Sequence, residues 1–131
     1  MALPVQPASA GTWCNSASWT VTKISPDYGT NEYFFRHTLG ICSDQNPSYW
    51  TITQVTADYV NYWGVQSPWV WNGVNLSNTW NDYWAGLWTR YTTQKQGDFQ
   101  WCVGNCSHVY PRIDMHGESS GYIYTDYARS E

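Results

Sequence analysis

The sequence predicts an all-β protein, either an antiparallel β-sandwich or a small barrel. Segments rich in Thr, Val, Ile, Tyr and Trp show the two-residue alternation of half-buried strands. Clusters of Gly, Pro, Asn and Asp interrupt these segments roughly every eight to twelve residues, as turns do in such folds. Aromatic residues make up 18% of the chain, and rings of this size can fill a core between two sheets.

The chain has 131 residues, which is the size of a single domain. Its first ten residues differ in character from the rest. They include Pro4 and Pro7, and they end in the run Ala8-Ser9-Ala10, a small-x-small pattern typical of signal-peptidase sites. We interpret residues 1–10 as a signal remnant or an extended N-terminal tail, and residues 11–131 as a single β domain.

Three strands are predicted in the first half of the domain. The first ends in clear alternation, with Trp19 and Val21 on one face and Thr20 and Thr22 on the other. A Ser-Pro-Asp-Tyr-Gly run and an Asp-Gln-Asn-Pro run supply the turns that follow the first and second strands. The strands are expected at 12–24, 32–42 and 48–59, with turns at 25–29 and 44–47.

The second half is less regular. Asn72-Gly73 lies between two short apolar runs and is a strong hairpin signal. The aromatic spacing from 80 to 91 fits one face of a helix, but residues four apart also share a face of a strand. Because Trp, Tyr, Thr, Asn and Asp are weak helix formers, we expect a strand from about Trp84. The segment 77–82 is then a loop or a single helical turn, a turn lies at 96–98, and the last two strands are 109–117 and 121–127.

This strand interpretation divides the aromatic side chains between two faces. Trp80, Trp84 and Trp88 share one face with Asp82, and because a core face rarely holds an Asp, we expect this row to be partly exposed. The opposite, core face is expected to carry Tyr83, Leu87 and Tyr91. The predicted binding residues are Trp69, Trp71, Trp80, Asp82, Trp84 and Trp88.

Four cysteines, Cys14, Cys42, Cys102 and Cys106, indicate an exported chain with two disulfides. Three pairings are possible, and we favour the pairing of nearest neighbours, Cys14–Cys42 and Cys102–Cys106. A zinc site made from the four is the alternative, although their spacing is not that of a zinc ribbon.

The charge pattern argues against several classes of partner. Six basic residues stand against ten acidic ones, and the basic residues are scattered singly, so no basic stripe exists to neutralise nucleic-acid phosphates. No apolar run approaches the ~18 residues of a membrane span. Phosphate-binding loops and dinucleotide fingerprints are absent, so we expect no cofactor.

The best candidate for chemistry is the set Asp114, His116 and Glu118. In a strand, these three side chains project from one face and could bind a metal ion or act as an acid–base pair. A solvated strand face is the alternative interpretation. The sequence has no nucleophile elbow of the Gly-x-Ser-x-Gly type. We therefore expect a non-catalytic protein.

A set of motifs carries a resemblance to a known group of proteins. They are an early Trp-Cys pair, then ICSD and ITQV, WGV and WVWNG, QGDFQWCV, HVYPRI and a glycine-rich final hairpin. From Gly11 to its end, the chain resembles small secreted β-proteins of actinobacteria. The resemblance implies export, an all-β fold and an actinobacterial source, but no activity and no catalytic residues.

Three functional hypotheses follow. The first is a secreted recognition protein that binds another protein through an aromatic surface, as an adaptor, toxin-complex component or inhibitor, because Tyr and Trp dominate protein-binding hot spots. The second is a carbohydrate-binding module or lectin for a cell-envelope glycan, since sugars stack on flat rings. The third is an envelope-directed toxin or hydrolase that uses Asp114, His116 and Glu118.

Overall fold

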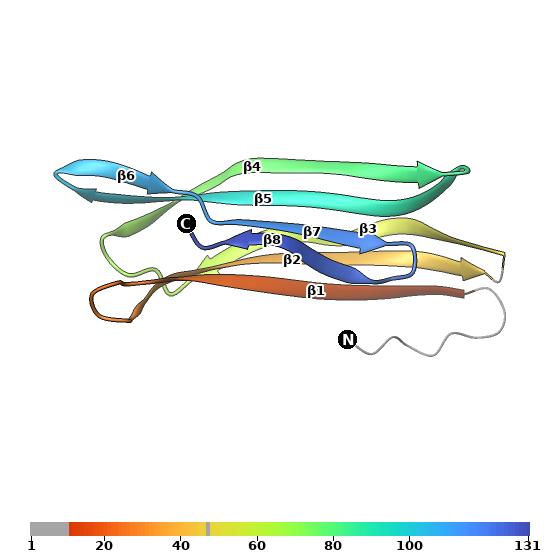
Figure 1. Cartoon of the computed structure of the whole chain (residues 1–131), viewed down its shortest axis with the longest axis horizontal. Helices are drawn as coiled ribbons and strands as arrows, with labels where there is room; N and C mark the ends of the chain where they lie inside the picture. Colours follow the sequence, from red (N-terminus) through yellow and green to blue (C-terminus); the bar gives the residue numbers. More distant parts are fainter. Residues whose placement is uncertain (1–10, 47) are drawn as a thin grey trace.

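The computed structural model describes residues 11–46 and 48–131 and shows an all-β fold of two antiparallel sheets, as predicted (Figure 1). Residues 1–10, which we interpreted as a signal remnant or an extended N-terminal tail, lie outside the described residues. The strands are β1 (Gly11–Ile24), β2 (Asn31–Asn46), β3 (Tyr49–Trp63), β4 (Trp69–Trp84), β5 (Leu87–Val103), β6 (Asn105–Val109), β7 (Arg112–Glu118) and β8 (Ile123–Arg129).

The strands form a sandwich. The first sheet has the order β1-β2-β3, and the second has the order β4-β5-β7-β8, with the short β6 paired to β5. Contacts between the layers place β3 against β5, β2 against β7 and β1 against β8. The long strands make an elongated body, and the β2–β3, β4–β5 and β7–β8 turns all point toward the same end, on the right in Figure 1.

The core lies between β2 and the β5–β7 part of the second sheet. Alternate residues of β2 are fully buried, because a strand presents every second side chain to the same face. Tyr33 of β2 stacks on Phe99 of β5, with ring centroids 3.9 Å apart. The largest buried hydrophobic side chains are Tyr33, Phe35, Leu39, Ile41, Phe99, Ile113 and Met115.

The turn predicted at 96–98 is wrong, because β5 continues through it. Gly97 lies on the core side of β5, where a Cβ atom would come within 2.5 Å of the Trp71 ring and 2.9 Å of the Phe35 ring. The glycine therefore serves close packing of these rings rather than a change of chain direction.

The hairpin predicted at Asn72-Gly73 is also wrong. The strand β4 runs through this point with irregular pairing to β5 near Gly73, and it includes the segment 77–82 that we expected to be a loop. The chain reverses instead at Ala85-Gly86, where φ is 50° and 80°. Two consecutive positive φ values are the geometry of a tight two-residue hairpin turn.

Both disulfides have the pairing that we favoured. Cys14 and Cys42 lie directly opposite each other on β1 and β2, and Cys102 and Cys106 close the β5–β6 hairpin. These bonds are consistent with an extracellular or secreted protein. Over the described residues, no helix has the length and apolar character that a membrane span requires.

Candidate functional site

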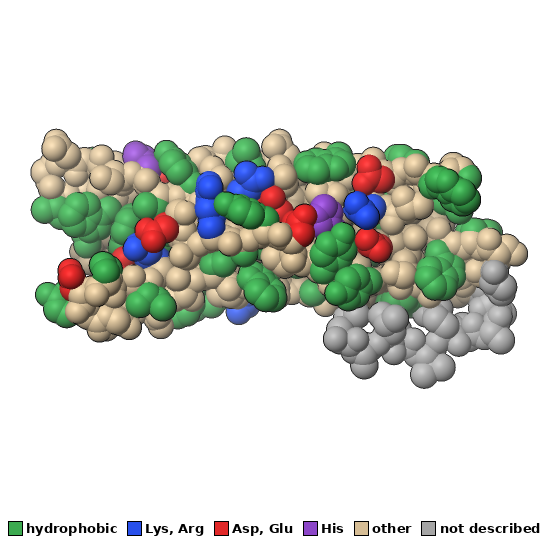
Figure 2. Space-filling model, in the orientation of Figure 1, with side chains coloured by type: hydrophobic (Ala, Val, Ile, Leu, Met, Phe, Trp, Pro, Cys, Tyr) green, Lys and Arg blue, Asp and Glu red, His purple; other side chains and the backbone are tan. Residues whose placement is uncertain are grey.

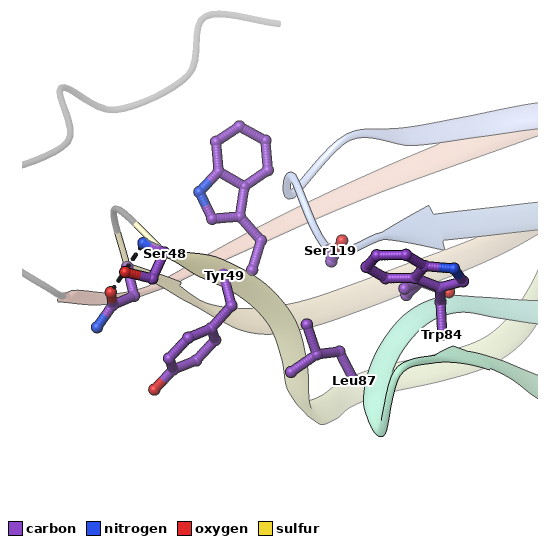
Figure 3. A pocket seen from close by; sticks show the side chains of 8 residues that line it. Ser48, Tyr49, Trp84, Leu87 and Ser119 are labelled. Carbon is purple, nitrogen blue, oxygen red and sulfur yellow. Dashed lines mark hydrogen bonds between the residues drawn. The ribbon is translucent and has the colours of Figure 1, made fainter.

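One end of the sandwich carries an open depression of about 420 Å³, which we call the aromatic depression (Figure 3). Trp84 and Leu87 reach it from the β4–β5 hairpin, whereas Ser48 and Tyr49 come from the β2–β3 turn. Its lining residues are Asn46, Ser48, Tyr49, Trp50, Trp84, Leu87, Thr89 and Ser119.

The aromatic rings of this depression are unusually accessible. The exposed fraction is 73% for Trp84, 49% for Trp50 and 43% for Tyr49. Leu87 is half-buried between them, so the surface is apolar in its centre as well as at its aromatic rim.

Hydrogen bonds hold the walls of the depression in place. The backbone N–H of Trp88 donates to Thr51 Oγ1 at 3.1 Å and ties the β4–β5 hairpin to β3. The backbone N–H of Ser119 donates to the Thr89 carbonyl oxygen at 2.9 Å and ties the β7–β8 turn to β5. The surface is therefore supported from both sheets before any partner arrives.

A second depression, of about 460 Å³, adjoins the first, and we call it the polar depression. It shares Thr89 and Ser119 with the aromatic depression. Its remaining lining residues, Asp82, Arg90 and Glu118, come from three neighbouring strands and lie opposite one another in the strand register. Arg90 Nη2 lies 3.4 Å from Glu118 Oε1, an exposed ion pair on the outer face of the second sheet.

The predicted binding residues separate into two groups. Trp80 and Trp84 are exposed, and Asp82 lines the polar depression. In contrast, Trp69, Trp71 and Trp88 pack against the core. We therefore leave these three out of the candidate site.

Particular ring contacts explain why Trp69 and Trp71 are not free to bind. Trp69 meets the Tyr33 ring edge-on at 5.6 Å, and Trp71 meets Phe99 edge-on at 5.0 Å. The predicted common face of Trp80, Trp84 and Trp88 does not form, because the Ala85-Gly86 turn places Trp88 on the next strand.

The predicted core face also differs in part from the structure. Tyr91 is buried and Leu87 is half-buried, but Tyr83 is 63% exposed. Tyr83 lies at the end of β4, after the irregular pairing that follows Asp82, and packs only loosely on Trp88, with ring centroids 6.5 Å apart. The simple alternation of faces therefore ends before the hairpin turn.

The set Asp114, His116 and Glu118 does share the outer face of the second sheet. Each side chain, however, has its own partner: Arg112 Nε lies 2.9 Å from Asp114, Asp126 Oδ2 lies 2.6 Å from His116 Nε2, and Arg90 pairs with Glu118. Asp114, His116 and Glu118 are therefore each paired with a different residue and do not form one site together. Among residues 11–46 and 48–131, no group of three or more His, Cys, Asp and Glu side chains is arranged to hold a metal ion.

The structure also reveals a buried polar cluster around Asp58, which sequence reasoning missed. Asp58 on β3 accepts hydrogen bonds from His37 Nε2 (2.8 Å), Thr93 Oγ1 (2.9 Å) and the Tyr91 hydroxyl (2.5 Å). His37 is fully buried, and its other ring nitrogen, Nδ1, donates to the Ile113 carbonyl oxygen at 2.9 Å. The cluster thus joins β2 and β3 to β5 and β7.

The ionisation of Asp58 follows from these contacts. Burial alone would raise the pKa of Asp58, but hydrogen bonds from His37, Tyr91 and Thr93 lower it below its ordinary value, with help from the charge of Lys95. The carboxylate therefore acts as an acceptor, and Lys95 Nζ lies 3.9 Å from Asp58 Oδ2. The cluster is an internal ionic tie between the two sheets.

Sequence reasoning also missed Tyr49 and Trp50. β2 continues to Asn46 and β3 begins at Tyr49, so the turn predicted at 44–47 starts too early. A nearby turn was nevertheless the available signal, because rings beside a turn can extend past the end of a sheet.

Comparison of the chain with protein-family models, with curated proteins and with solved structures finds no match. The resemblance to actinobacterial secreted proteins therefore stays a prediction.

Proposed function

We propose that this chain is a secreted, non-catalytic recognition protein that binds a protein partner through the aromatic depression. The observation that carries the proposal is the group of exposed rings, Tyr49, Trp50 and Trp84, around the half-buried Leu87. Soluble monomers rarely leave such a contiguous apolar surface in water unless it serves an interaction.

The composition of the surface resembles that of a binding hot spot. Tyr, Trp and Arg are the residue types that most often dominate the binding energy of protein interfaces. Here Leu87 and the rings around it form the apolar part, and the polar side chains of Asn46, Ser48, Thr89 and Ser119 line the same depression. This arrangement of apolar centre and polar rim is typical of protein–protein contacts.

The shape of the surface favours a macromolecule. A small-molecule site encloses most of its ligand, whereas the aromatic depression lies between two turns and is open to solvent. A partner that presents one protruding apolar side chain could place it over Leu87, with the three rings around it. The two disulfides support an extracellular location for this contact.

Site-directed photo-cross-linking tests the proposal. A photo-reactive phenylalanine analogue replaces Ser48 at the depression or, as a control, Asp27 at the opposite end, and the labelled protein is irradiated in the secreted fraction of the source organism. We expect one stoichiometric protein adduct from position 48 and none from position 27, with the adduct lost when Trp84→Ala is added. An adduct that survives Trp84→Ala, or no adduct from position 48, contradicts the proposal.

A further inference from the structure

We infer that the outer face of the second sheet carries a second binding site, centred on Arg90 and Glu118, for a neutral carbohydrate. This site goes beyond the proposed protein contact at the aromatic depression. Figure 2 shows this side of the molecule, where acidic, basic and histidine side chains lie among hydrophobic side chains over β4, β5, β7 and β8.

The polar part of the site is one row across three strands. Asp82 on β4 lies opposite Arg90 on β5, which in turn lies opposite Glu118 on β7. The Tyr124 hydroxyl donates to Glu118 Oε1 at 3.4 Å, the same oxygen that Arg90 contacts. Burial raises the pKa of Tyr124, so its hydroxyl stays a donor. Planar carboxylate and guanidinium groups held in this way can each bond two neighbouring hydroxyls of a sugar.

The aromatic part of the site is the next row on the same face. It contains Trp80, which is 44% exposed, and His116, both opposite Thr92 of β5. The His116 ring stacks on Tyr124 at a centroid distance of 5.0 Å, and Tyr124 stacks on Tyr122 at 5.4 Å. A row of stacked rings offers flat apolar surface of the kind that packs against the C–H face of a pyranose.

The two rows are close enough to act on one ligand. They are two residues apart along each strand, which is about 7 Å, and neighbouring strands are about 4.8 Å apart. A ligand of one or two sugar rings that lies on the Tyr122–Tyr124 surface therefore reaches Glu118 and Arg90.

The charges of the site select against anionic ligands. An anion that approaches Arg90 also meets the carboxylates of Asp82 and Glu118, and a metal cation that approaches these carboxylates meets the guanidinium between them. Arg90 offsets only one of the two carboxylates, so the row keeps one net negative charge, which disfavours anions. No group of three or more His, Cys, Asp and Glu side chains in the described part of the chain is arranged to hold a metal ion, so hydrogen bonding and stacking are the interactions left to recognise a ligand. A neutral, hydroxyl-rich molecule meets these conditions.

Affinity electrophoresis of the full chain in native gels tests the inference. The gels contain one of five soluble neutral polysaccharides: xylan, laminarin, mannan, dextran or glycol chitin. We expect at least one of them to retard the wild-type protein, and Glu118→Gln and Tyr122→Ala each to weaken this retardation by about tenfold, the effect of losing one charge-assisted hydrogen bond or one stacked ring. Tyr28→Ala, which removes an 84% exposed ring at the opposite end, should leave it unchanged.

The outcomes separate this inference from the proposed function. Tyr122→Ala should keep the protein adduct at position 48, and Trp50→Ala should keep sugar binding. Thermal unfolding of each variant confirms that it is folded. Mobility that none of the five polysaccharides changes, or retardation that survives both Glu118→Gln and Tyr122→Ala, overturns the inference.

Discussion

Replacement of Asp58 by Ala removes the acceptor at the centre of the buried polar cluster. The substitution removes the hydrogen-bond partner of His37 Nε2 and of the Tyr91 hydroxyl. His37 is fully buried, and Tyr91 is 9% exposed. Water cannot easily replace the carboxylate between two packed sheets, so the change should be costly.

The magnitude follows from comparison with a matched pair on the surface. Breaking a buried ion pair by removal of one partner typically costs about 3–5 kcal/mol, and we expect Asp58→Ala to lower the free energy of unfolding by this amount. Asp126 also pairs with a histidine, His116, but its side chain is 48% exposed, so Asp126→Ala should cost about 1 kcal/mol or less. Urea unfolding of the two variants measures the difference directly.

The acid dependence of stability supplies a second readout. Because the pKa of Asp58 is lower in the folded chain than in the unfolded chain, where it is near its ordinary value of about 4, the unfolded state binds more protons as the pH falls. The contribution of Asp58 is complete above about pH 5 and is lost as the pH drops through the folded-state pKa. Asp58→Asn should weaken this loss. An Asp58→Ala variant within about 1 kcal/mol of the wild type, or an unchanged acid dependence in Asp58→Asn, would refute this reasoning.

Two further substitutions test the fold. Gly97→Ala places a methyl group 2.5 Å from the Trp71 ring. Such overpacking should lower the free energy of unfolding, measured by urea titration, by about 1–3 kcal/mol. A loss below about 0.5 kcal/mol would show that the ring moves freely. Ala85→Asn should raise the melting temperature, because Ala85 adopts φ of 50° in a turn that favours Asn-Gly, and relief of this conformation contributes about 1 kcal/mol. A lower melting temperature would contradict that interpretation of the turn.

The strands of the first sheet could be predicted because their signals are local. Thr, Val and aromatic residues alternate through β1, and proline and glycine mark the turns around it. The second sheet was harder, since its glycines serve different purposes. Gly97 lies in a strand because rings from other strands need its space, and Gly73 lies beside irregular pairing, whereas Gly86 makes the turn. Only the positions of distant residues distinguish these roles.

The candidate site could be predicted only in part for the same reason. Local alternation puts Trp80 and Asp82 on one face, and both are exposed on β4, although we expected the segment 77–82 to be a loop or a helical turn. It also puts Asp114, His116 and Glu118 on a common face. It could not show which aromatic rings the facing sheet covers, so Trp69 and Trp71 were assigned to the surface. It also could not show that the β2–β3 turn brings Trp50 beside Trp84.

The most direct test of the central claim is the dissociation constant of the cross-linked partner, once purified, for the wild type and for single-ring variants. Trp84→Ala and Trp50→Ala should each weaken binding at least about 30-fold, as loss of a hot-spot residue worth about 2 kcal/mol does, whereas Tyr28→Ala should leave it unchanged. Equal affinities for all four proteins, with each variant folded, would contradict the assignment of recognition to the aromatic depression.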